Sequence, residues 1–154
     1  MSGPFKLQTL LSLREQAQAE AELKLRGAVE HLDAMVTEQR RLTTLLQSYE
    51  THLLQLMNGV APGRTAAALQ ARDQFMVRLR ADVQAAKQAL AHHQQGPLAQ
   101  ALRDEQQARD ELLLAKQELE LLHRHKDQAE AVERKIAERR EDHAVDDWVI
   151  SKRR

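Results

Sequence analysis

Apolar residues recur along most of this chain in alternating steps of three and four. Before residue 58 the repeating positions are Ala21, Leu25, Ala28, Leu32, Met35, Gln39, Leu42, Leu46, Tyr49, Leu53 and Leu56. After residue 65 they are Leu69, Arg72, Met76, Leu79, Val83, Ala86 and Leu90, and then Leu98, Ala101, Glu105, Ala108, Leu112, Ala115, Leu119, Leu122, Lys126, Ala129, Glu133 and Ile136. We call these the seam positions. A repeat of about 3.5 residues keeps one narrow stripe facing a partner helix, which favours a coiled coil over a globular bundle with wider apolar faces.

The two runs of seam positions are separated by the stretch 58–63, which reads Asn-Gly-Val-Ala-Pro-Gly. Asn-Gly and Pro-Gly favour turns because glycine adopts positive φ easily and proline fixes its own φ. The sequence therefore predicts an all-α fold, a long antiparallel two-helix coiled-coil hairpin forming a single domain over residues 1–154. The first helix is expected over about 5–57 and the second over about 65–149, with a projecting C-terminal helix beyond the first helix's start.

The second helix is interrupted at Gly96-Pro97, where the seam spacing also slips, because His93 and Leu98 are five residues apart. Proline inside a helix removes one hydrogen bond and its ring clashes with a carbonyl of the preceding turn. Two interpretations follow: one long helix kinked at this point, or a second turn that makes three antiparallel helices. We favour the kink, since a lone Gly-Pro without a polar loop is little evidence for a reversal.

The opening of the chain, residues 5–14, is its most apolar stretch. Its apolar spacing differs from the regular repeat that begins at Ala21, and such a stutter locally unwinds a coiled coil. Phe5, Leu7 and Leu11 are therefore candidates for contact with another protein, although a continued seam would also explain Leu7 and Leu11.

Composition agrees with a long-helix protein, because aromatic residues make up only 3% and charged residues 30%. The chain has no cysteine, which excludes disulfides and thiolate metal sites. It also has no apolar run of membrane-spanning length and no secretory signal, so we expect it in the cytoplasm.

The formal net charge is zero, which argues against nucleic-acid binding. The charge is uneven, however: residues 64–103 carry six basic and two acidic side chains, and residues 104–120 carry two basic and six acidic ones. This asymmetry is explained either by a solvated surface or by a positive patch near the turn for an acidic partner.

No motif for catalysis, cofactor binding or metal binding is present. The seven histidines include the pairs His92-His93 and His123/His125, whose spacings do not place two ligands on one helical face. The glycine-rich phosphate loops and the nucleophile motif of hydrolases are also missing. We therefore expect no catalytic residues, no cofactor, no metal and no enzymatic activity.

Three segments resemble the FliJ family of flagellar export proteins. These are the opening run 5–15, a middle segment with Gln74, Phe75 and Leu79, and a C-terminal helix with the runs 121–126, 138–141, 146–147 and 152–154. The resemblance spans the whole chain, and the injectisome stalk proteins of the YscO type are similar. Gly96-Pro97 departs from the smooth second helix expected of the family.

The resemblance implies a cytoplasmic, non-enzymatic stalk of a type III export apparatus, at the cytoplasmic face of the inner membrane. Such a stalk promotes assembly and activity of a hexameric export ATPase, links it to the membrane export gate, and in some members binds export chaperones. The residues implied to contact the ATPase ring are Phe5, Leu7, Leu11, Arg139, Arg140 and Trp148. The residues implied to contact the gate are Phe75 and Leu79. The alternative is a generic coiled-coil adaptor or scaffold dimer with no ATPase partner; binding to a membrane surface is disfavoured by the mixed charges.

Overall fold

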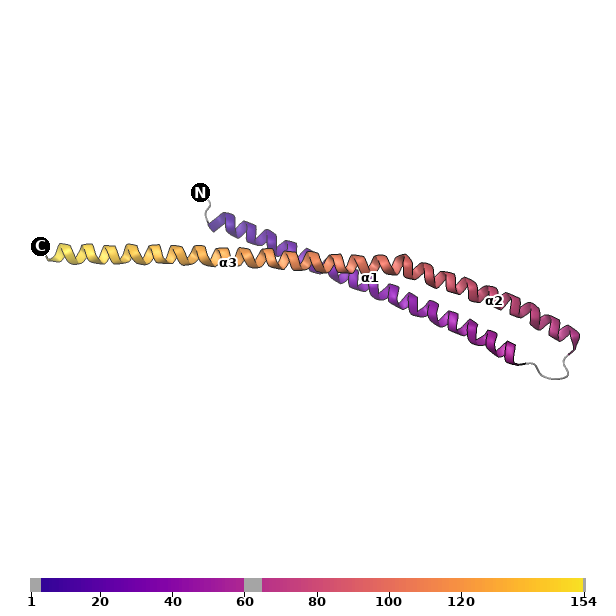
Figure 1. Ribbon diagram of the computed structural model, residues 1–154. Helices are drawn as coiled ribbons and strands as arrows, with labels where there is room; N and C mark the ends of the chain where they lie inside the picture. Colours follow the sequence, from indigo (N-terminus) through magenta and orange to yellow (C-terminus); the bar gives the residue numbers. More distant parts are fainter. Residues whose placement is uncertain (1–3, 60–64, 154) are drawn as a thin grey trace. The chain divides into compact units, whose positions relative to one another are not determined.

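The protein, in a computed structural model that describes residues 4–59 and 65–153, is built from α-helices. Helices account for 97% of this described part, which contains no strand. Their order is α1 (Pro4–Asn58), α2 (Ala66–Gln95) and α3 (Pro97–Lys152) (Figure 1). The expected all-α helical hairpin is confirmed. The predicted turn at 58–63 lies mostly outside the described residues, which resume at Thr65.

The ends of α1 follow from local chemistry. The helix begins at Pro4, where the missing proline N–H would have no partner in any case. It ends at Asn58, and a Cβ on the following Gly59 would lie 2.9 Å from the carbonyl oxygen of Gln55. The guanidinium Nε of Arg72 donates to the carbonyl of Leu56 at 3.1 Å. A seam arginine of α2 therefore satisfies one of the carbonyls that the end of α1 leaves without an intrahelical donor.

Helix α2 begins after Thr65, as the sequence predicts. Thr65 has extended backbone angles, and its hydroxyl accepts a hydrogen bond from the N–H of Ala68 at 3.2 Å. This is an N-cap, which satisfies one of the free donors of the first turn and typically stabilises a helix by about 1 kcal/mol.

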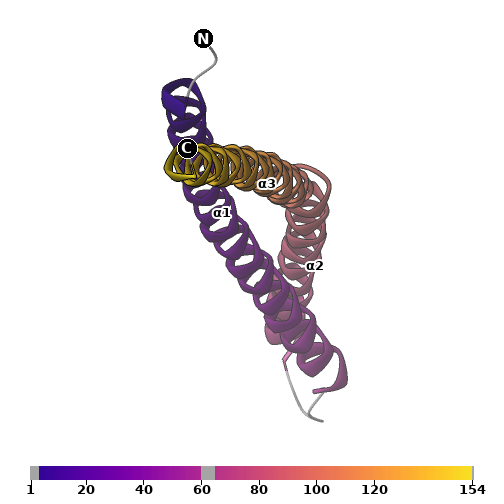
Figure 2. The same cartoon turned by 90° about the vertical axis from the view of Figure 1, so that its left-hand side faces the viewer.

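Between α2 and α3 the helix bends by 18° at residue 96. The change of direction where α2 passes into α3 is visible in Figure 2. Helical hydrogen bonds continue on both sides, from the N–H of Gly96 to the carbonyl of His92 and from the N–H of Gln100 to the carbonyl of Gly96, both at 2.9 Å. The kink is therefore confirmed and the alternative of a second turn is wrong. Proline removes one hydrogen bond here without reversing the chain.

Packing divides the chain into two compact units. One, which we call the hairpin unit, contains residues 25–59 and 65–108. The other, which we call the terminal unit, contains residues 4–24 and 109–153.

In the hairpin unit the seam spacing is confirmed except at its first position on α2, where Leu69 is exposed. Every seam residue of α1 from Leu25 to Leu56 is buried or half-buried. The buried residues of the unit are Leu42, Met76, Leu79, Val83, Ala86, His93, Leu98, Ala101, Glu105 and Ala108. All of them are seam positions except His93, which continues the same spacing three residues after Leu90. The core is thus a single stripe on each helix, as a coiled coil requires.

In the terminal unit the start of α1 pairs with α3 in antiparallel fashion. Leu11 is buried, and the seam positions of α3 from Leu112 to Ala129 are half-buried. Two exposed ion pairs connect the helices, Arg14 with Glu118 at 2.6 Å and Lys24 with Glu111 at 2.7 Å. From residue 132 to residue 153 every side chain of α3 is exposed. This segment is the projecting C-terminal helix that the sequence predicts.

Candidate partner-binding surfaces

Residues 132–153, which form the end of α3 and the position after it, are exposed throughout, and we call them the C-terminal arm. Its six large apolar side chains are all exposed, between 37% and 58% of their surface. They are Val132, Ile136, Val145, Trp148, Val149 and Ile150. A charged helix can remain in water with isolated apolar residues, but six within 22 positions make this arm a candidate binding surface.

Trp148 is the largest of these side chains and has a defined neighbour. The Lys152 ammonium lies 4.3 Å from the centre of the indole ring, in a cation–π contact one helical turn away. The lysine covers part of one ring face, and 58% of the tryptophan surface still remains accessible. The ring is thereby oriented on the helix while it stays available to a partner. Arg139 and Arg140 are also exposed, and as consecutive helical residues they point to different sides of α3.

Of the two explanations that the sequence leaves open for Leu7 and Leu11, the structure agrees with the continued seam. Leu7 is half-buried and Leu11 is only 4% exposed, so both take part in packing within the terminal unit. The side chain of Phe5 lies outside the described ones. Leu11 is thus a core residue in this structure, and a partner reaches it only where α1 and α3 separate.

The accessible apolar residues of this region are ones that the sequence did not single out. Leu10 is 43% exposed, Leu13 is 56% exposed, and Leu121 on α3 is 64% exposed. A shallow groove of about 280 Å³ runs between the two helices here. It is lined by Leu10, Arg14, Glu118, Leu121, Leu122 and His125. The irregular apolar spacing before Ala21 is the sequence feature that indicates Leu10, because such a stutter places apolar residues at the edge of the seam.

Phe75 is the candidate on the hairpin unit with a partly free aromatic ring. It is 42% exposed and packs edge-on against the imidazole of His52 on α1, with ring centres 5.5 Å apart and planes at 65°. This is the T-shaped arrangement that aromatic pairs favour. Leu79, one turn further along α2, is only 4% exposed. The two residues therefore differ: Phe75 presents a surface, and Leu79 belongs to the core beneath it.

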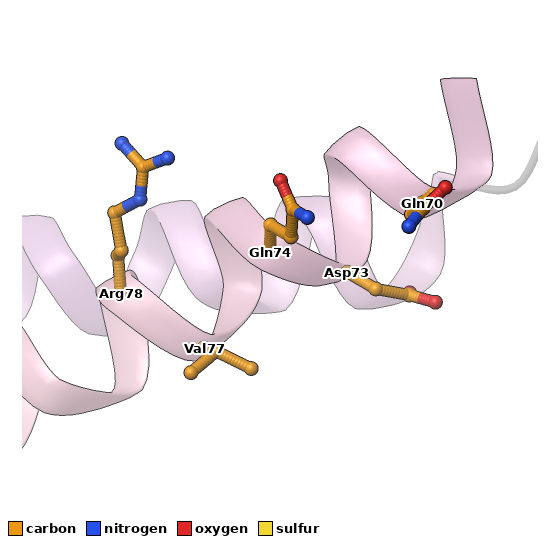
Figure 3. Close-up of a pocket in the computed structure, with 5 residues that line it drawn as sticks. All are labelled: Gln70, Asp73, Gln74, Val77 and Arg78. Carbon is orange, nitrogen blue, oxygen red and sulfur yellow. The ribbon is translucent and has the colours of Figure 1, made fainter. Parts of the chain in front are cut away.

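A second hollow on α2 lies close to Phe75 in sequence, but it is made by one helix alone (Figure 3). Its lining residues are Gln70, Asp73, Gln74, Val77 and Arg78. Val77 and Arg78 point away from each other across it. An open surface of this kind does not exclude water from a substrate, so it offers no catalytic pocket.

The electrostatics of the described residues are those of a solvated helical surface. Ion pairs within or between helices, such as Lys87 with Glu50 at 3.9 Å, join exposed side chains. The hydrogen bond and charge of Arg41 hold the pKa of the Glu38 carboxyl below its ordinary value. Among residues 4–59 and 65–153, no three metal-binding side chains gather closely enough to hold an ion. None of the helices described there combines the length and apolar character needed to cross a membrane.

Comparison with known proteins adds the decisive observation. The family model of the flagellar FliJ protein matches residues 2–153, almost the entire chain. The chain belongs to the FliJ family. No curated protein and no solved structure matches it, so the family model carries the assignment.

Membership in the FliJ family implies a stalk role in the flagellar export apparatus. Proteins of this family are non-catalytic. The helical hairpin agrees with this family-level role.

Proposed function

We propose that this protein is the central stalk of a flagellar type III export apparatus, and that it promotes assembly and activity of a hexameric export ATPase and links this ATPase to the membrane export gate. The observation that carries the proposal is the family match over residues 2–153. The exposed C-terminal arm supports it, because a stalk needs a segment whose apolar side chains are not used by its own fold.

In this proposal the ATPase ring contacts the terminal unit. Trp148, Arg139 and Arg140 are exposed on the C-terminal arm and can meet a ring directly. Phe5, Leu7 and Leu11 belong to the same contact at the other end of the chain. Since Leu11 is buried and Leu7 half-buried, we assign them the role of holding α1 against α3, with direct contact through the exposed neighbours Leu10 and Leu13.

The export gate contacts the hairpin unit through Phe75. Its accessible ring, backed by His52, is a typical anchor for a protein interface. Leu79 supports this contact from the core, one turn away. The location of the complex is then the cytoplasmic face of the inner membrane, and export chaperones are further partners to which no residue is assigned.

The proposal is tested by ATP hydrolysis with the export ATPase of the same organism. Adding this chain should raise the hydrolysis rate in a saturable manner, and a truncation after Ala131 should abolish the stimulation. The double variant Arg139→Ala/Arg140→Ala and the variant Trp148→Ala should each weaken it. Val77→Ala is the matched control, because Val77 is 64% exposed but lies in the hairpin unit. An unchanged rate at saturating full-length chain would refute the stalk function.

The gate contact needs a separate experiment. Phe75→Ala should lower the affinity for the cytoplasmic domain of the gate protein, measured by titration calorimetry, while Val77→Ala leaves it unchanged. If both variants bind the gate domain as tightly as the unmodified chain does, Phe75 is not a gate contact. The proposed ATPase contact is unaffected by that result.

A further inference from the structure

A second line of residues runs along α3 beside its seam. Each of its members directly precedes a seam residue, so the line repeats in the same steps of three and four. One residue along an α-helix is a rotation of about 100°, and the line therefore faces a different side of α3 from the seam. We call it the outer line. Its members are Leu114, Glu118, Leu121, His125, Gln128, Val132, Lys135 and Arg139.

The apolar members of the outer line are not used by the fold. Leu114 is 58% exposed, Leu121 is 64% exposed and Val132 is 57% exposed. By contrast, the seam residues Ala115 and Leu122 beside the two leucines are half-buried. Large apolar side chains that recur on one side of a helix at helical spacing form a surface that another helix can cover. The terminal unit thus covers the seam of α3 and leaves the outer line accessible.

Where the start of α1 lies beside α3, the outer line forms one wall of a groove. This groove of about 280 Å³ is lined by Leu121 on α3 and by Leu10 on α1, which is 43% exposed. Glu118, the acidic member of the outer line, forms an ion pair with Arg14 at 2.6 Å, so its charge is already balanced within the terminal unit. A groove with apolar residues on both walls is the kind of surface that binds the apolar face of an amphipathic helix.

Beyond the groove the outer line is basic. Residues 121–143 contain six acidic and six basic side chains, yet the outer line in this stretch includes Lys135 and Arg139 and no acidic residue. Both are exposed, and neither has an ion-pair partner among residues 4–59 and 65–153. Ile136, which is 45% exposed, lies beside them one turn after Val132. Apolar and basic side chains together are complementary to a helix that has an apolar face edged by carboxylates.

We propose that the outer line is a docking site for an acidic amphipathic helix of another protein, which packs on α3 as a third helix and whose carboxylates meet Lys135 and Arg139. From Leu114 to Arg139 the line extends over about 38 Å, so a helix of about seven turns covers it. The inference goes beyond the stalk proposal, which assigns Arg139 to a partner without naming the chemistry of that partner. It rests on the stalk proposal only in taking the C-terminal arm as a contact surface.

The experiment uses the full chain and two synthetic helical peptides. Both peptides carry leucines in steps of three and four on an alanine background, and the positions beside the leucines are glutamates in one peptide and lysines in the other. Fluorescence anisotropy of a label on the peptide measures binding. We expect saturable binding of the glutamate peptide and binding of the lysine peptide that is at least about tenfold weaker at low ionic strength, because like charges repel at an interface. Equal binding of the two peptides, or no saturable binding of the glutamate peptide, would overturn the proposal.

A matched pair of leucine variants locates the apolar part of the site. Leu121→Ser should weaken binding of the glutamate peptide at least about tenfold, as expected when one leucine is no longer buried by a partner. Leu113→Ser should leave binding unchanged, because Leu113 is 57% exposed but lies on another side of α3. Equal losses in the two variants would show that the peptide does not bind along the outer line.

A second pair of variants tests the charges. Lys135→Glu/Arg139→Glu should invert the preference in favour of the lysine peptide, because the outer line then carries carboxylates. Arg134→Glu/Arg140→Glu makes the same change of net charge on other sides of α3 and should retain the preference for the glutamate peptide. All four side chains are exposed, so the fold should be retained, and circular dichroism checks this. An unchanged preference in the first variant, or an inversion in both, would overturn the proposal.

Sedimentation equilibrium of the chain alone tests the other occupant, a second copy of this chain. The proposal predicts that the outer line does not mediate self-association. A dimer that Leu121→Ser dissociates would show that a second copy covers the outer line, and it would overturn the proposal. Stimulation of the export ATPase by the unmodified chain is measured independently of these peptides, so a failure here is distinguishable from a failure of the stalk function.

Discussion

Helix α2 and the C-terminal arm of α3 both carry apolar side chains, but α2 buries its seam residues whereas the arm leaves its apolar residues exposed. Between Met76 and His93, α2 buries five residues against α1. Between residues 132 and 153, α3 carries six large apolar residues and buries none. The difference lies in spacing. The apolar residues of α2 repeat at the seam interval, whereas those of the arm are irregular and lack a partner helix within the terminal unit. Apolar content therefore does not predict burial here, and spacing combined with a partner does.

The largest effect in this comparison is expected from the core of the hairpin unit. Leu79→Ala removes a side chain that is 4% exposed and should lower the free energy of unfolding by about 2–4 kcal/mol. Val77→Ala, two residues away and 64% exposed, should change it by less than about 0.5 kcal/mol. Urea unfolding followed by circular dichroism measures both. Equal effects of the two variants would contradict the assigned seam.

The arm should behave in the opposite way. Trp148→Ala removes the largest side chain of the chain, yet the free energy of unfolding should change by less than about 0.5 kcal/mol, since the indole is 58% exposed and its cation–π neighbour Lys152 belongs to the same helix. The same urea titration tests this. A loss comparable to that of Leu79→Ala would show that Trp148 is packed in solution and would exclude it as a free contact residue.

The smallest effect concerns pH. Arg41 donates to the Glu38 carboxylate at 2.7 and 2.9 Å, and this pair lowers the pKa of Glu38 in the folded chain. A lowered folded pKa means that the pair stabilises the helix above the unfolded pKa and that this contribution is lost as the pH falls through the folded pKa. In Arg41→Ala the Glu38 pKa should rise, as seen by carboxyl NMR titration, while Arg40→Ala should leave it unchanged. An identical Glu38 pKa in the unmodified chain and both variants would show that the ion pair with Arg41 does not lower this pKa.

Much of this fold could be predicted from the sequence, because the core residues of a coiled coil recur at a regular interval. The seam from Leu25 to Leu56, the start of α2 near residue 65 and the kink at Gly96-Pro97 follow from periodicity, turn-forming residues and proline chemistry. Each of these features depends only on neighbours within a few turns of the same helix.

The contacts that depend on the pairing of two helices could not be predicted. Spacing places His93 at the seam, but only the register shows that it meets the carbonyl of Met35. The contact between the rings of His52 and Phe75 likewise depends on how α1 and α2 pair, so spacing alone does not predict it. At the start of α1 the irregular spacing left the direction of Leu11 open, and the structure shows it buried while Leu10 is exposed. The sequence thus identified the segment that contains the candidate site, but it did not identify which side chains of that segment are accessible.

The most direct test of the stalk function is sedimentation velocity of the purified chain, alone and with the export ATPase of its own organism in the presence of nucleotide. The account predicts a monomer that joins the ATPase as one chain per hexameric ring, and a truncation after Ala131 that fails to join. A stable homodimer that sediments independently of the ATPase would contradict it, and would make the chain a coiled-coil adaptor instead.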